Sequence, residues 1–361
     1  MFRLPPLPSL RDFIYMYRLK AKKILSQNYL MDMNLTRKIA RKAGVTENSH
    51  VIEIGPGPGG ITRAILERNC RSLNVIELDS RFIPPLQHVA EAAEGRMKIH
   101  RQDILKTDIA DVWKDYENEK SEWLDDRKIN NFHIIGNLPF NIASPLIIKY
   151  LRDMSYRRGA WKFGRVPLTL TFQAEVARRI CSPVDTDDRS RISIVSQYIS
   201  EPEYIFEIPG GCFVPAPKVN VGVVKFVPRI EPLIPCSFEV VEKVARHIFH
   251  YRQKNIIKCI KTFYPEELSK DLANSLLEKC GISSRAVSYQ LGMQEFSDIC
   301  QVYEKQCLEI PGLFIYDYTR VKDTLESLQS KENLFPPLLH NSYNLLEKDG
   351  ISFKESKILI N

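Results

Sequence analysis

The feature that most constrains the fold of this chain is a glycine-rich turn between an expected strand and an expected helix. An apolar run at residues 50–54 is typical of a buried strand, and the next residues read Gly55-Pro56-Gly57-Pro58-Gly59-Gly60. A helix is expected directly afterwards, at 61–68. Glycines in such a turn let the backbone bend tightly and approach a bound ligand closely. The pattern predicts an α/β domain that holds its ligand where the first strand ends.

Further apolar runs alternate with segments of helical periodicity. Strands are expected at 73–78, 97–100, 132–135, 166–172 and 221–227, and helices at 35–43, 145–151 and 174–180. Strands separated by helix-length segments indicate βαβ units. We therefore expect a mostly parallel sheet flanked by helices.

The alternation ends at a proline-rich stretch, and helical periodicity follows it. Pro228, Pro232 and Pro235 mark a linker, after which helices are expected at 238–262, 265–279 and 294–306. The pattern is lost from residue 321. We predict a basic N-terminal arm or presequence over 1–24, the α/β domain over 25–230, an all-helical domain over 231–320 and a tail over 321–361.

The N-terminal residues differ in charge from the rest of the chain. Within the first 23, six are basic and one is acidic: Arg3, Arg11, Arg18, Lys20, Lys22 and Lys23 against Asp12. Residues 10–18 have the pattern of a basic amphipathic helix. Three interpretations stay open: a mitochondrial presequence, a basic arm, or an ordinary helix packed on the domain.

Composition excludes few function classes. The chain has 51 Lys+Arg against 44 Asp+Glu, a net charge of +7, which permits an acidic partner without requiring one. The 8 cysteines form no CxxC pair, and His247 and His250 have no further ligand types clustered around them. We expect reduced thiols and no metal site. No apolar run approaches the roughly 20 residues of a membrane-spanning helix, so no membrane association is expected.

The ligand of the glycine turn can be narrowed by its neighbours. Gly55, Gly57 and Gly60 also fit the GxGxxG pattern of NAD or FAD sites, so a nicotinamide oxidoreductase stays an alternative. A structural turn that binds no ligand is another. Glu53, however, would repel a pyrophosphate and suits a cationic sulfonium ligand with an ammonium group. The two prolines of the turn also lack the backbone N–H groups that a phosphate would bind. These points favour S-adenosylmethionine.

Two further carboxylates fit that ligand. Glu77 ends the second expected strand, where a carboxylate accepts hydrogen bonds from ribose hydroxyls. Asp103 follows the third expected strand, where it is placed to accept a hydrogen bond from an adenine amine.

The fourth expected strand is followed by Asn137-Leu138-Pro139-Phe140. A base amine is a poor nucleophile because its lone pair is delocalised into the ring. The Asn137 side-chain oxygen and the Leu138 carbonyl would accept its two N–H bonds and aim the lone pair at a methyl carbon. Pro139 restricts the backbone before it, and Phe140 offers a face for stacking. We therefore predict methyl transfer to a base amine; a plain strand-to-helix turn is the alternative.

A proline loop, residues 211–219, precedes the last expected strand. Phe213 in this loop is expected to stack on the second face of a flipped base, opposite Phe140. The alternative is a rigid loop with Phe213 in the core.

Taken in order, Gln27-Asn28-Tyr29-Leu30, the glycine turn, Glu77, Asp103, the Asn137–Phe140 corner and the proline loop resemble the rRNA adenine dimethyltransferase family. The similarity runs from about residue 22 to 310 and is greatest to the mitochondrial members. It implies a class I (Rossmann-like) methyltransferase sheet with a small all-helical C-terminal domain. It also implies S-adenosylmethionine-dependent dimethylation of two adjacent adenines in a hairpin of small-subunit rRNA, in the mitochondrial matrix, in support of small-subunit ribosome assembly.

By motif position, the resemblance also implies site residues. The cofactor would contact Gln27, Asn28, Leu30, Gly55, Gly57, Glu77, Leu78, Asp103, Ile104 and Asn137, and the target adenine would meet Asn137, Leu138 and Phe140. The family often has tyrosine where Phe140 stands, and phenylalanine stacks equally well. A non-catalytic mitochondrial transcription or ribosome-assembly factor that retains the fold is the alternative function, and the mitochondrial transcription machinery is then a further partner.

Three basic clusters are candidates for RNA contact. They are residues 155–165, which include three aromatic side chains; residues 246–261, with Arg246, Arg252, Lys254, Lys258 and Lys261; and the group Arg178, Arg179, Arg189 and Arg191. Basic side chains neutralise phosphates and aromatic ones stack on unpaired bases. The alternative for each cluster is a solvated surface.

Overall fold

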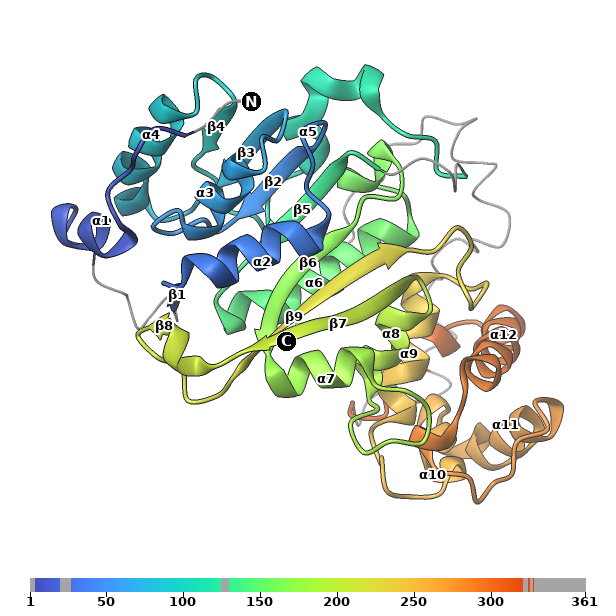
Figure 1. The fold of residues 1–361 in the computed structure, drawn as a ribbon. Coiled ribbons are helices and arrows are strands. Elements are labelled where there is room, and N and C mark those ends of the chain that lie inside the picture. Colours follow the sequence, from blue (N-terminus) through green and yellow to red (C-terminus); the bar gives the residue numbers. More distant parts are fainter. Residues whose placement is uncertain (1–3, 20–26, 125–129, 321–323, 325–326, 328–361) are drawn as a thin grey trace. The chain divides into compact units, whose positions relative to one another are not determined.

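A computed structural model describes residues 4–19, 27–124, 130–320, 324 and 327 of the 361-residue chain (Figure 1). The chain forms two compact units, the first ending at Pro232 and the second beginning at Leu233. Each unit is described by itself.

The first unit is built on a seven-stranded sheet of order β4-β3-β2-β5-β6-β9-β7. The parallel part consists of β4 (Met97–His100), β3 (Ser72–Ile76), β2 (His50–Ile54), β5 (Phe132–Gly136) and β6 (Leu168–Gln173). Two antiparallel strands, β9 (Val221–Pro228) and β7 (Ser200–Ile208), complete it. A separate small sheet pairs β1 (Tyr29–Leu30) with β8 (Phe213–Val214). The predicted mostly parallel sheet is confirmed.

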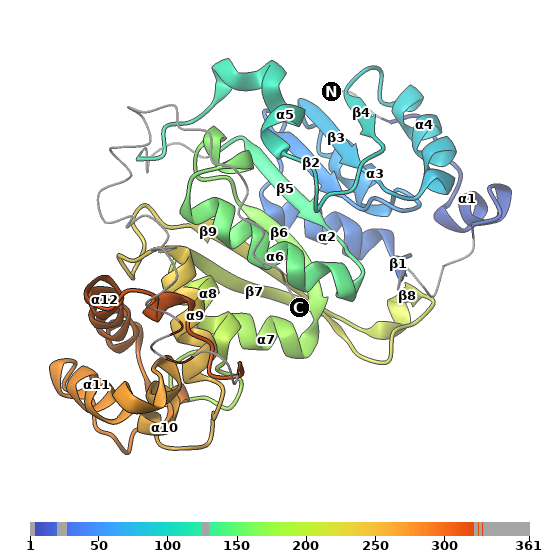
Figure 2. The same ribbon diagram turned by 180° about the vertical axis from the view of Figure 1, so that it is seen from behind.

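Helices cover both faces of this sheet. They are α2 (Met33–Ala43), α3 (Gly60–Glu67), α4 (Ile83–Ala92), α5 (Ile109–Trp113), α6 (Phe140–Ser155), α7 (Ala174–Cys181) and α8 (Arg191–Gln197). Figure 1 shows α2 on the near face, and Figure 2, from behind, shows α6 on the opposite face. Local signals set the ends of α2: the Asp32 carboxylate accepts the N–H groups of the first turn, and left-handed Gly44 follows the last.

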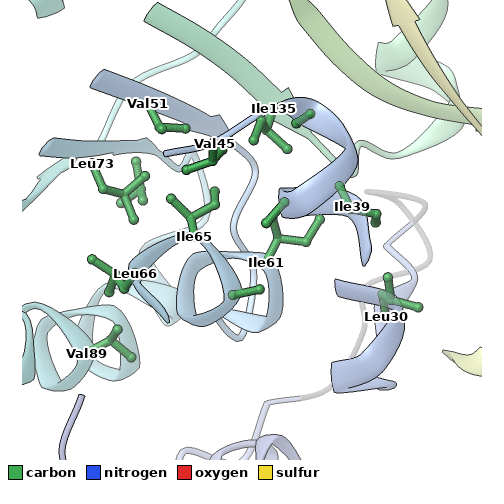
Figure 3. Close-up of a cluster of buried hydrophobic side chains, with 14 of the residues drawn as sticks. Leu30, Ile39, Val45, Val51, Ile61, Ile65, Leu66, Leu73, Val89 and Ile135 are labelled. Atoms are coloured by element: carbon green, nitrogen blue, oxygen red, sulfur yellow. The ribbon is translucent and has the colours of Figure 1, made fainter. Parts of the chain in front are cut away.

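The core that supports the glycine turn lies between α3 and the sheet. Ile61 and Ile65 of α3 pack with Val51 of β2, Leu73 of β3 and Ile135 of β5, all buried (Figure 3). Because α3 begins directly after the glycine turn, this packing fixes the position of the turn. Burial of such side chains stabilises the fold by roughly 1.5–3 kcal/mol each.

The N-terminal segment packs on the same unit. Helix α1 (Leu10–Met16) begins at a capping box between Ser9 and Asp12 and buries Phe13 completely. The guanidinium carbon of Arg63 in α3 lies 4.3 Å from the centre of the Phe13 ring. This packing matches the interpretation as an ordinary N-terminal helix.

The second unit is helical, with α9 (Phe238–Ile248), α10 (Ile256–Ile260), α11 (Glu266–Lys279) and α12 (Met293–Glu309). The single helix predicted for 238–262 is wrong, because the chain turns between α9 and α10. Lys254 N–H donates to the Tyr251 carbonyl at 2.8 Å within that turn. None of the side chains of Tyr251–Asn255 is buried, so nothing there holds a helix against the domain. Most of the predicted tail over 321–361 lies outside the described residues.

Other predictions need correction. Strand β7 was not expected, because Glu201, Pro202 and Glu203 interrupt its apolar pattern; as an edge strand it tolerates them. Helix α6 begins at Phe140 rather than Pro145, and the proline lies inside it.

No helix in the described part of the chain has the length and apolar character needed to cross a membrane. Across the same residues, no three or more His, Cys, Asp and Glu side chains gather as a metal site would require.

Candidate active site

Three neighbouring parallel strands bring the predicted site residues to one edge of the sheet. Ile54 of β2 lies opposite Ile76 of β3 on one side and Gly136 of β5 on the other. The next residues along these strands are Gly55, Glu77 and Asn137. Ligands bind α/β sheets at the carboxyl ends of their strands, so this edge is the candidate site.

The glycine turn has the backbone conformation expected of it. Gly55 and Gly57 have φ angles of 64° and 53°, in the left-handed region that favours glycine. A Cβ atom at Gly57 would lie 3.6 Å from the Tyr29 ring, and one at Gly55 would lie 3.2 Å from the Leu138 side chain. A side chain at either position would therefore crowd these neighbours.

The cleft beside the turn gathers most of the predicted ligand-binding residues. Its lining includes Gln27, Asn28, Leu30, Gly55, Gly57, Glu77 and Asn137. Pro139 and Glu53 line it as well. Sequence reasoning used Glu53 to choose the ligand but did not count it among the site residues, and Tyr29 and Phe82, also in the lining, were missed.

The structure places the remaining predicted cofactor residues outside that lining. The Leu78 side chain is 58% exposed, whereas Ile104 is buried. The Asp103 carboxylate accepts the N–H of Leu105 at 3.0 Å. Their contact with a cofactor stays a prediction.

Glu77 is held by the backbone around it. One carboxylate oxygen accepts the N–H of Gly57 at 3.2 Å, and the other accepts the N–H of Asp79 at 2.8 Å. Burial raises the pKa of Glu77, and these N–H groups counteract that rise. The carboxylate therefore ties the glycine turn to the end of β3 while it faces the cleft.

Glu53 is the second carboxylate in the cleft wall, and it is 1% exposed. Its Oε2 atom is buried and has no hydrogen-bond partner in the described structure. Burial, with a smaller contribution from the charge of Glu77, raises the pKa of Glu53 to about 8. A bound cation would favour the ionised form of this carboxyl group and would use its free oxygen, so the site fits a cationic group in this cleft.

This raised pKa predicts a stability effect of replacing Glu53 with glutamine. The ordinary pKa of glutamate is 4.5, so between pH 4.5 and about pH 8 Glu53 keeps a proton in the folded protein that it has released in the unfolded chain. The free energy of unfolding should therefore fall as pH rises through that window. Glu53→Gln cannot ionise, so in urea denaturation it should be more stable than the unsubstituted protein at pH 8 and equal to it near pH 4. If the free energies of unfolding of the two proteins differed by the same amount at every pH, the raised pKa of Glu53 would be contradicted.

Asn137 stands at the end of β5 with both ends of its side-chain amide engaged. Thr171 Oγ1 donates to Asn137 Oδ1 at 2.8 Å, and Asn137 Nδ2 donates to the Asn28 carbonyl at 3.4 Å. Leu138 is buried, and Phe140, the first residue of α6, is partly buried. A second cavity, of about 260 Å³, includes Phe140, Phe172 and Gln173 in its lining. Asn137 and Pro139 therefore face one cavity and Phe140 the other.

The structure does not place Phe213 as expected for stacking on a base. Its ring is 3% exposed and belongs to the hydrophobic core, and its backbone pairs with Leu30 in the small sheet. A ring covered on all sides has no free face, so the structure agrees with the core interpretation of Phe213 and not with the stacking prediction.

The three basic clusters differ in how many of their side chains are exposed. Trp161 and Phe163 of the first are buried in the core, so they offer no stacking face. In the third, Arg189 is buried, and Arg178 and Arg179 form ion pairs with acidic neighbours. The buried members of these two clusters therefore serve packing, and the ion pairs engage two of the exposed arginines. In the second, the exposed cations are Arg246, Lys254, Lys258 and Lys261.

Comparison with known proteins decides the family. A sequence profile described as "Ribosomal RNA adenine dimethylase" matches residues 18–299. The chain belongs to this family. It is therefore an rRNA adenine dimethyltransferase, as the motifs predicted, and the nicotinamide oxidoreductase alternative is wrong.

Named relatives of this rRNA adenine dimethylase agree. "Dimethyladenosine transferase 1, mitochondrial" of Caenorhabditis elegans is 63% identical over 337 residues, 93% of this chain and 92% of that protein. The Homo sapiens protein of the same name is 44% identical over 329 residues, 91% and 93% of the two chains. The predicted mitochondrial location is confirmed.

A solved structure shows the fold. The crystal structure of a dimethyladenosine transferase from Plasmodium falciparum superposes with a TM-score of 0.58 at 20% identity, over 76% of this chain and 97% of that chain. The predicted class I methyltransferase sheet is confirmed.

Proposed function

We propose that this dimethyltransferase uses S-adenosylmethionine to dimethylate two adjacent adenines in a hairpin of mitochondrial small-subunit rRNA, in the matrix, and so supports assembly of the small ribosomal subunit. One observation carries the proposal. The Asn137 amide, suited to a base amine, and the buried Glu53 oxygen, suited to a cation, line the same cleft.

The residues of the cleft fit this donor. The Glu77 carboxylate lines the cleft and accepts two backbone N–H groups, which leaves further lone pairs on its oxygens. These would accept hydrogen bonds from the ribose hydroxyls. Glu53 would pair with the ammonium group, and Asp103 would accept from the adenine amine. When bound, S-adenosylmethionine supplies a methyl group activated by a positively charged sulfur.

The protein's own contribution to the reaction is mainly orientation. Asn137 Oδ1 and the Leu138 carbonyl accept the two N–H bonds of the target amine, which moves its nitrogen toward tetrahedral geometry. With its lone pair aimed in this way, the amine nitrogen would accept the methyl group that bound S-adenosylmethionine supplies, and the amine proton would leave to water. Orientation of this kind can supply several kcal/mol of the barrier reduction, up to about 7–11 kcal/mol.

A methyl-transfer assay tests the proposal. The protein is incubated with tritiated S-adenosylmethionine and the hairpin of its mitochondrial small-subunit rRNA, and the products are digested and separated. Dimethyladenosine at two adjacent positions is expected, and none from a hairpin with guanines at those positions. Protein that binds the donor yet leaves every adenine unmodified, in bare rRNA and in immature small subunits alike, would overturn it.

Phe140 provides a prediction about the target base. If its ring stacks on the flipped adenine, Phe140→Tyr keeps the stacking face and should retain activity within a factor of about two. Phe140→Ala should lower kcat/KM for RNA by roughly ten- to a hundredfold, given about 1–3 kcal/mol for stacking of one base on an aromatic ring. Donor affinity, measured by calorimetry, should stay unchanged in both variants. Equal activity of the alanine and tyrosine variants would rule out stacking.

The second unit is proposed to contact the rRNA. Lys254, Lys258 and Lys261 are exposed near helix α10, with Arg246 on α9. Side chains of this type bind phosphates without reading sequence, so they suit a substrate that is held mainly by its backbone.

A further inference from the structure

The hydroxyl of Thr171 lies against the side chain on which the proposed chemistry depends. We propose that Thr171 is a positioning residue: its hydroxyl holds the Asn137 amide in the orientation that presents Oδ1 to the target amine. The inference rests on the role proposed above for Asn137.

Sheet register explains why these two residues meet. Strands β5 and β6 are parallel, and Gly136 of β5 lies opposite Leu170 of β6. Asn137 follows Gly136, and Thr171 follows Leu170. Beyond this point β5 ends, whereas β6 continues and pairs Thr171 with Val223 of β9. Thr171 is therefore fixed in a central strand while Asn137 stands at the start of a turn.

The hydrogen bonds define which way the amide faces. The Asn28 carbonyl can only accept, so the atom that faces it at 3.4 Å must be Nδ2. Oδ1 then faces Thr171, and the hydroxyl donates to it at 2.8 Å. The amide is anchored at both ends, from β6 and from the segment before β1.

The Thr171 hydroxyl is important for Asn137 because it is buried. Thr171 is 1% exposed, so water cannot replace its hydroxyl. Asn137 is only partly buried and lines the cleft, and an amide oxygen has a second lone pair with which to accept from the target amine. The terminal torsion of asparagine is otherwise broad. Without the hydroxyl, Oδ1 would sample orientations that no longer point at the amine.

The first test removes the hydroxyl with little change of shape. Thr171→Val should lower the single-turnover rate of methyl transfer by roughly ten- to a hundredfold, the range typical of groups that orient an active residue. The KM for RNA and the Kd for S-adenosylmethionine should stay within about twofold. Thr169→Val is the matched control, because Thr169 is also buried, at 2% exposed, and precedes Thr171 by two residues on the same strand. It should retain the full rate.

Two smaller variants keep the test valid if valine disrupts folding. Thr171→Ser retains the hydroxyl and Thr171→Ala does not, although the two side chains differ in little else. Serine should retain most of the rate, and alanine should lose as much as valine. Equal rates for serine and alanine would overturn the inference, as would a Thr171→Val enzyme that works as well as Thr169→Val.

A spectroscopic measurement on the unliganded protein is independent of turnover. The side-chain amide signal of Asn137 can be assigned in ¹⁵N NMR spectra by its absence in Asn137→Ala. It should shift in Thr171→Ala and not in Thr169→Val. An unshifted signal would show that the hydroxyl does not hold the amide, whatever the activity of the enzyme.

Discussion

Replacing Asn137 with alanine is expected to reduce methyl transfer by about a hundred- to a thousandfold, the usual effect of removing one preorganised polar contact to a reacting group. The side chain lies at the end of β5 in the cleft wall, and its amide is held by Thr171 and the Asn28 carbonyl. Alanine at this position removes the proposed acceptor for the target amine but leaves Glu77 and Glu53 in place. Donor affinity, measured by calorimetry, should therefore fall much less than the transfer rate.

Asn131→Ala is a suitable control for this experiment. Asn131 is exposed just before the same strand, so its loss should affect neither rate nor affinity. If Asn137→Ala transferred methyl groups at the unsubstituted rate, the orientation mechanism would be excluded. In cells that lack the protein, full rescue by Asn137→Ala would show that a role in ribosome assembly or transcription does not depend on methylation, and failure of rescue would tie the role to methylation.

The edge of the sheet that carries the site could be predicted because local and global signals agree there. Glycines at 55 and 57 are needed where φ is positive, and apolar strands precede Gly55, Glu77 and Asn137 in the chain. Parallel pairing then brings these residues to one edge with no further information. For this reason the glycine turn, Glu77 and the Asn137 corner were found together.

Features set by tertiary packing could not be read from the sequence. Phe213 is flanked by glycine and proline residues that suggest an exposed loop, yet its strand pairs with Leu30 and its ring enters the core. Arg189 lies in a basic cluster but is buried. Charge and aromaticity mark a residue as able to bind RNA, and only the folded chain shows whether the side chain is accessible.

The contact between Thr171 and Asn137 is of the same kind. Thr171 lies in an apolar strand, where threonine is ordinary, and nothing in its neighbours along the chain sets it apart. Its relation to Asn137 follows only from the register between β5 and β6.

Replacing Glu77 with alanine should weaken both donor binding and the fold. The side chain is 7% exposed and accepts the N–H groups of Gly57 and Asp79. Leaving a buried N–H without a partner costs about 1–3 kcal/mol, so the loss of these bonds should lower the free energy of unfolding by a few kcal/mol. Loss of the proposed acceptor for the ribose hydroxyls, together with a less ordered glycine turn, should raise the donor Kd by roughly a hundredfold.

Comparison with the other carboxylate of the cleft separates the two effects. Glu53→Gln should raise the free energy of unfolding at pH 8, because it removes a buried group whose pKa is about 8, yet it should also weaken donor binding, because glutamine cannot pair with an ammonium group. Glu77→Ala should lower both the free energy of unfolding and the affinity for the donor. Urea denaturation and calorimetry on the two variants, with the exposed Glu91→Ala of α4 as control, would measure them. If Glu77→Ala kept the donor affinity of the control, the proposed contact between Glu77 and the ribose hydroxyls would be excluded.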